Sequence, residues 1–114
     1  MEELTADQAA EVERLLGLLD ELFKAHTSGK LKLFVGRALT EPEMPLVIAF
    51  VGTVGGATLD PGAAHEIAGY AEEYARRMKQ QERADSLHGM ARALREAADA
   101  ADRLGPIFRV ARRA

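Results

Sequence analysis

The stretch MPLVIAFVGTVGG, residues 44–56, decides how this sequence folds. It is apolar on every side, and the run from Met44 to Leu59 carries no charged residue. A helix that is apolar all round lies either at the centre of a core or inside a membrane. As a helix this run would span about 24 Å, less than the roughly 30 Å of a bilayer's hydrocarbon layer. We therefore expect a buried central helix, with a buried strand and a membrane segment as the alternatives.

Helix start signals lie on both sides of this stretch. Thr5 and Gln8 have the spacing of a capping box, in which each side chain satisfies a free backbone N–H at the helix start. Thr40 and Glu43 repeat that spacing just before the apolar stretch. Asp60-Pro61 is a third start signal, with Asp as the N-cap and Pro at the first helical position. We expect helices over about residues 6–25, through the apolar stretch, and over about 61–81.

Two other segments are less clear. In Lys30–Leu39 the apolar residues alternate as in a strand, yet they fit a helix equally well. We favour a short helix, because no clear partner strand follows. Residues 80–86 are polar and interrupt the apolar register, which favours a break near Asp85-Ser86. From Leu87 to Leu104 the apolar residues then form a seam close to a heptad repeat, ended by Gly105-Pro106.

These elements predict an all-α, single-domain bundle of about four to five helices around a central apolar helix. The domain is expected over residues 1–106, with a short basic C-terminal tail over 107–114. A length of 114 residues fits one domain, and 47% hydrophobic with 29% charged residues is typical of a globular chain.

The sequence excludes several chemistries. The chain has no Cys, so it cannot form disulfides, thiolate zinc sites or a Cys nucleophile. His26, His65 and His88 are too far apart to share a helix turn. Residues 52–56, GTVGG, lack the Lys and Ser/Thr that follow the glycines of a phosphate-binding loop. We expect no enzymatic activity, and no catalytic, cofactor-binding or metal-binding residues.

The expected function is protein interaction. Gly52 and Gly56 are four residues apart, so another helix could approach that face closely. The arginine-rich tail could contact an acidic partner or anionic lipid, but a chain of net charge −3 gives no clear indication of nucleic-acid binding. We expect a protein partner or homo-oligomer. The interaction residues expected are Ile48, Phe50, Gly52, Gly56, Leu87, Met90, Leu94, Arg109, Arg112 and Arg113.

The sequence predicts a cytoplasmic location. It begins with Met1-Glu2-Glu3, whereas a secretory signal has a basic start followed by an apolar run. No transmembrane segment is expected, although peripheral membrane contact stays open.

From Leu15 to about Arg77 the sequence resembles a family of small helical proteins labelled as a domain of unknown function. The resemblance rests on a Leu-rich first helix ending at Ser28-Gly29 and on the turn Glu41-Pro42-Glu43 before an apolar helix. It also rests on Gly56-Ala57-Thr58-Leu59-Asp60-Pro61, which opens the next helix, and on the stretch 87–94. Genes of that family often accompany non-canonical formate dehydrogenases and related redox complexes. The resemblance implies an accessory subunit that docks on a catalytic redox subunit near quinone or membrane, with no catalytic residues of its own.

A second hypothesis is a regulatory module that binds a small apolar ligand or an acidic macromolecule. It would use Tyr70 and Tyr74, which lie one helical turn apart, together with the arginine tail.

Overall fold

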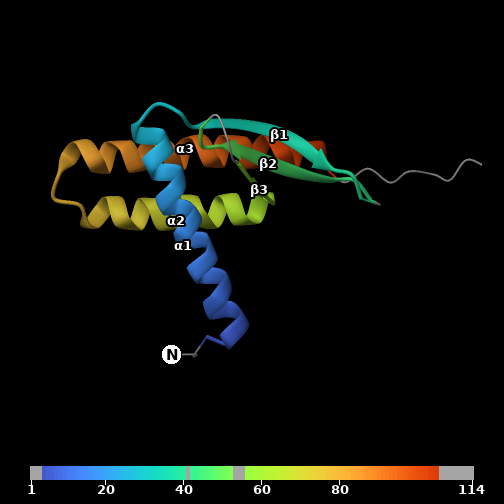
Figure 1. Cartoon of the computed structure of the whole chain (residues 1–114), viewed down its shortest axis with the longest axis horizontal. Helices are drawn as coiled ribbons and strands as arrows, with labels where there is room; N and C mark the ends of the chain where they lie inside the picture. The colour runs from blue at the N-terminus through green and yellow to red at the C-terminus, as the bar shows by residue number, and fades with distance from the viewer. Residues whose placement is uncertain (1–3, 41, 53–55, 106–114) are drawn as a thin grey trace, which may run out of the picture.

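A computed structural model describes residues 4–40, 42–52 and 56–105, and in these ranges the fold is mixed α/β (Figure 1). The elements in chain order are α1 (Ala6–Thr27), β1 (Lys32–Ala38), β2 (Met44–Phe50), β3 (Gly56–Leu59), α2 (Pro61–Arg77) and α3 (Gln81–Leu104). The expected all-α bundle of four to five helices is therefore wrong. The expected tail over residues 107–114 lies outside the described residues.

The apolar stretch forms the central strand of a sheet instead of a helix. β2 pairs antiparallel with β1 and with β3, in the order β1-β2-β3. Its side chains alternate, with Pro45, Val47 and Ala49 buried and their neighbours only half-buried or exposed. Pro45 is compatible with a central strand because β3 pairs only with residues 47–50, so among the described strands β1 alone pairs at this position. Both faces of this strand are apolar, which is why its sequence has no visible period of two.

Lys30–Leu39 is also corrected, since it contains strand β1 and not a short helix. Its partner strand is the apolar stretch itself, with Phe34 directly opposite Ile48. Thr40 does not cap a helix; its hydroxyl donates to the carbonyl of Pro42 within the turn between β1 and β2.

The local start signals of α1 and α2 are confirmed. The Thr5 hydroxyl accepts from the Gln8 N–H at 3.1 Å, and the Gln8 side chain accepts from the Thr5 N–H at 2.9 Å. The Asp60 carboxylate accepts from the N–H of Ala63 at 2.7 Å. The break expected near Asp85-Ser86 lies earlier, at residues 78–80, and α3 runs through both residues.

Helices α2 and α3 form an antiparallel hairpin, and both α1 and the sheet pack against it (Figure 1). Their contact is lined by small side chains, which let the two backbones approach closely. α1 crosses the hairpin and buries Leu15, Leu19 and Leu22 against it. The sheet packs on the hairpin through Val47, Ala49 and Leu59. The alanines buried in the hairpin are Ala63, Ala64, Ala68, Ala71, Ala75, Ala84, Ala91, Ala98 and Ala101.

Arg37 joins the sheet to the end of α3. Its guanidinium donates to the carbonyl of Gly105 at 2.9 Å and to that of Leu104 at 3.4 Å. Carbonyls in the last turn of a helix have no intrahelical partner, and a cation there also interacts favourably with the helix dipole.

Within the described ranges, none of the helices combines the length and the apolar character needed to span a bilayer.

Replacing Val47 and Ile48 in turn by Asp distinguishes a strand from a helix over this stretch. Val47→Asp buries an unpaired charge under the sheet, where Val47 has 0% exposure, and should cost at least about 4 kcal/mol of unfolding free energy. The side chain at position 48 lies on the opposite face of the sheet. Ile48→Asp should therefore lower the unfolding free energy by roughly 1–2 kcal/mol and leave the chain folded. Urea unfolding followed by circular dichroism measures both. Equal destabilisation by the two substitutions would contradict the assigned strand.

Candidate functional site

The structure separates the residues expected at an interaction surface into four groups. Ile48 and Phe50 lie on the side of β2 that faces away from the helices, and Gly56 is directly opposite Phe50. Leu87, Met90 and Leu94 are buried within the protomer and belong to its own core. Gly52 lies just after β2. The three arginines, Arg109, Arg112 and Arg113, lie outside the described residues.

The outer face of the sheet is mostly apolar over β1 and β2, with Lys32 at one end and Gly56 and Thr58 on β3. Directly paired residues of an antiparallel sheet share a face, so the register defines this surface. Ile48 packs over Gly36, where an added Cβ would lie 2.7 Å from Ile48 Cδ1. We call this surface the outer sheet face, and it consists of Lys32, Phe34, Gly36, Ala38, Met44, Leu46, Ile48, Phe50, Gly56 and Thr58.

Two aromatic rings dominate the outer sheet face. Phe34 and Phe50 are in edge-to-face contact, with ring centroids 5.6 Å apart and ring planes at 79°. They remain 51% and 43% exposed, so neither ring is covered by the rest of the described chain. Sequence analysis missed Phe34, because only the strand register places it diagonally across from Phe50. The alternation of Leu31, Leu33 and Val35 was the signal that favoured a strand here.

Two lysines border these rings. A hollow of about 530 Å³ is lined by Lys30, Lys32, Phe34 and Phe50, together with Gly29 and Gly52. Both lysines are exposed, and within the described part of the chain neither forms an ion pair. The outer sheet face therefore joins an apolar surface to positive charge at one end.

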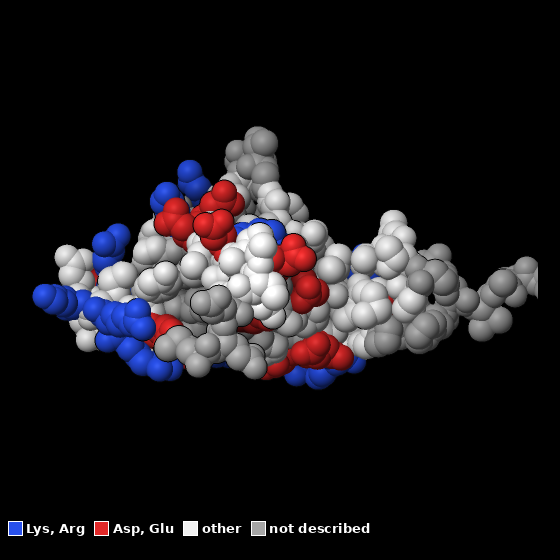
Figure 2. Space-filling view, turned by 90° about the horizontal axis from the view of Figure 1, so that it is seen from below, with Lys and Arg blue, Asp and Glu red and all other residues white. Residues whose placement is uncertain are grey.

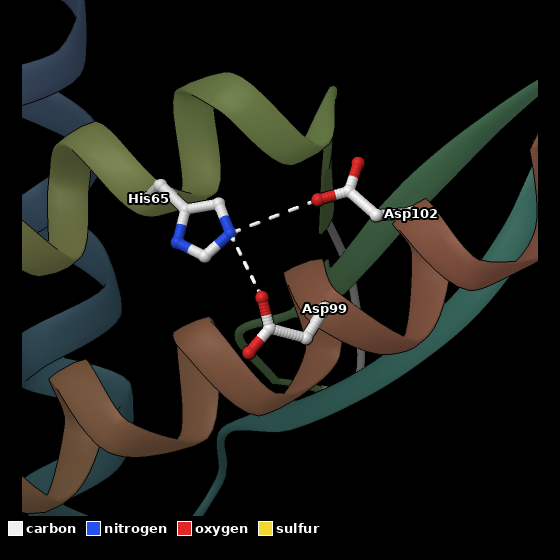
Figure 3. Close-up of side chains that lie close together, drawn as sticks. All are labelled: His65, Asp99 and Asp102. Atoms are coloured by element: carbon white, nitrogen blue, oxygen red, sulfur yellow. Dashed lines mark ion pairs between the residues drawn. The ribbon is translucent and has the colours of Figure 1, made fainter.

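A histidine and two carboxylates form a second cluster, on the hairpin (Figure 3). His65 Nε2 in α2 lies 3.2 Å from Asp99 Oδ1 and 3.8 Å from Asp102 Oδ2, both in α3. Asp99 and Asp102 are three residues apart, so they share one helix face. The sequence analysis did not find this cluster, because the spacing of Asp99 and Asp102 gives no sign that His65 faces them.

The chemistry of this cluster is that of an exposed ion pair. It offers three atoms that could ligate a metal ion, all within 4.8 Å of one another. The Asp side chains are 61% and 58% exposed, however, and exposed acidic groups commonly gather without a metal. A protonated His65 would hold the start of α2 against the end of α3, and an exposed pair of this kind contributes at most about 1 kcal/mol.

The outer sheet face is therefore the stronger candidate site, because exposed aromatic side chains are costly to leave in water unless something covers them. Comparison of the chain with protein-family models, with curated proteins and with solved structures finds no match.

Proposed function

We propose that this protein is a non-catalytic protein-interaction subunit that binds its partner through the outer sheet face. The exposed Phe34–Phe50 pair is the observation that carries this proposal. Contiguous exposed apolar surface on a soluble chain is typical of protein-binding sites. Aromatic side chains are also the residues that most often dominate binding energy when a partner covers them.

The charges beside the rings specify the partner's chemistry. Lys30 and Lys32 lie at the end of the outer sheet face that holds both rings. A partner segment with an apolar side and carboxylates at its rim would cover the rings and pair with the lysines. Such rim charges mainly raise the association rate and fix the orientation of the partner.

A non-catalytic role is supported by the residue types present. Besides one threonine and Lys32, the outer sheet face is built from aliphatic and aromatic side chains, glycine and alanine, and it carries no histidine or carboxylate that could work with the lysine in acid–base chemistry. The exposed His65 cluster lies on the hairpin and away from this surface.

The family resemblance supplies a first candidate partner, the catalytic subunit of a formate dehydrogenase-like redox complex. The apolar segment that the resemblance takes as a helix is strand β2, so this candidate rests on the turn motifs and the first helix. We propose a cytoplasmic location for this interaction.

The alternative, a small-ligand module built on Tyr70 and Tyr74, has weaker support. The two hollows that Tyr74 lines have volumes of about 230 and 160 Å³. Drug-sized ligands occupy pockets of about 300–1,000 Å³, and each of these two adjoining hollows is smaller than that.

Photo-crosslinking should locate the partner on the outer sheet face. A photoreactive residue at position 34 should give one discrete adduct in cells, whereas the same residue at position 39 should give none. Leu39 is the matched control, because it is 90% exposed and apolar but follows the end of β1. The adduct from position 34 should disappear when Phe50 is replaced by Asp. Equal adducts from both positions would contradict the proposal.

Charge reversal tests the partner's acidity. Lys30→Glu combined with Lys32→Glu should weaken binding of the crosslinked partner, once identified and purified, by about tenfold, since each exposed charge pair is worth roughly 0.2–1 kcal/mol. The same change at Lys79, far from the sheet, should leave the affinity within about twofold. Isothermal titration calorimetry at low and high salt measures the effect, and unchanged binding by the double variant would rule out an acidic partner.

A further inference from the structure

Helix α1 extends well beyond the hairpin that it crosses (Figure 1). Its buried residues begin at Leu15, and every residue of Ala6–Arg14 is exposed except the half-buried Val12. We call Ala6–Arg14 the α1 arm. An isolated helix shorter than about 12–15 residues is only marginally stable in water, so a projecting arm of this length gains little from its own hydrogen bonds. Leu4, which precedes the N-cap Thr5, is 60% exposed.

The arm carries the pattern of a coiled-coil seam. Along the side of α1 that faces the end of α2, residues recur at alternating spacings of four and three, which is the a/d pattern of a heptad repeat. The seam residues are Thr5, Ala9, Val12, Leu16, Leu19 and Phe23. In the protomer only the C-terminal part of this seam touches the hairpin, and Ala9 is exposed.

A groove lined mainly by apolar residues, and also by Asp20, Glu73 and Arg77, runs beside the seam. It consists of two adjoining hollows between α1 and α2, which share Leu16 and Tyr74. Val12 lines one hollow, and Phe23 and Met78 line the other. The groove therefore continues from the base of the arm toward the turn between α2 and α3.

The charges at the two ends of this surface are opposite. The α1 arm holds Asp7, Glu11 and Glu13 against one base, Arg14. Arg14 also forms an ion pair with Glu11 at 2.6 Å, and its hydrogen bond lowers the pKa of that carboxyl group. At the other end, the turn between α2 and α3 carries a cluster that we call the basic end, formed by Arg76, Arg77, Lys79 and Arg83.

Figure 2 shows blue side chains gathered at the left end of the molecule, over this turn, and red side chains over the middle, where α1 projects. Within the described ranges, no side chain of the basic end makes an ion pair. Val12 of the arm and Arg77 of the basic end line the same hollow, but within the described ranges no ion pair joins the arm to the basic end of the same protomer.

We propose that the α1 arm docks in the α1–α2 groove of a second copy of this chain, giving a symmetric dimer with antiparallel α1 helices. In this arrangement the seams of the two α1 helices face each other. The arm of each copy lies over the other copy's Tyr74 and Met78, and its carboxylates reach the other copy's Arg76 and Arg77. One two-fold axis forms both contacts, as an isologous interface requires. This surface is separate from the outer sheet face, so either proposal can fail without the other.

Two neighbouring alanines provide a matched test of the seam. Ala9 and Ala10 are both exposed in the protomer, and successive residues of a helix point about 100° apart. Ala9→Lys places a charge in the seam and should weaken dimerisation at least about tenfold, whereas Ala10→Lys should change it by less than about threefold. Sedimentation equilibrium over a concentration series measures both dissociation constants. A wild-type chain that stays monomeric up to millimolar concentration, or equal effects of the two substitutions, would overturn the proposal.

Charge exchange between copies tests the pairing of arm and basic end. One variant carries Asp7→Lys with Glu11→Lys, and the other carries Arg76→Glu with Arg77→Glu. Each alone should dimerise at least about tenfold more weakly than wild type, because like charges then face each other. An equimolar mixture should recover wild-type affinity to within about threefold, because the mixed dimer restores opposite charges at both contacts. A mixture that dimerises as weakly as either variant alone would exclude this docking geometry.

Discussion

The close contact between α2 and α3 is the interaction on which the rest of the structure depends. Ala64, Ala68, Ala71 and Ala75 recur along one side of α2, and each is almost completely buried. Alanine is the best helix former and loses no side-chain entropy on burial, so this contact favours two straight helices packed closely together. The hairpin then supplies the apolar surface that both α1 and the sheet cover. A three-stranded sheet with one apolar face needs helices packed against that face, because the sheet alone cannot bury enough apolar surface to be stable.

The parts of the fold that the sequence predicts correctly are those decided by neighbouring residues. The capping interactions of Thr5 and Asp60 involve residues three positions away, so their spacing alone identifies them. The apolar stretch could not be assigned in this way. Whether Met44–Phe50 is helix or strand depends on its pairing with Lys32–Ala38, and local periodicity carries no information on such a contact.

In the candidate site, too, the sequence predicts what neighbouring residues decide and misses what depends on contacts between distant segments. Ile48 and Phe50 were expected at an interaction surface because the segment is so apolar, and both lie on the outer sheet face. Phe34 was missed because only the register with β2 brings it there. The opposite error affects Leu87 and Leu94, whose heptad spacing suggested a seam for a partner. Within the protomer this seam packs against the buried alanines of α2, so it is not available to a partner.

The bond from Arg37 to the end of α3 has a consequence for how the molecule opens. Arg37 lies in an edge strand, and its guanidinium holds carbonyls 67 and 68 residues further along the chain. Edge strands and terminal helix turns are ordinarily the first parts of a domain to open, each with its own small free energy. Here β1 and the last turn of α3 cannot separate without breaking the hydrogen bonds that Arg37 donates to Leu104 and Gly105. The sheet edge and the last turn of α3 should therefore exchange their amide hydrogens as one cooperative unit, and the outer sheet face keeps its shape for as long as that unit stays closed.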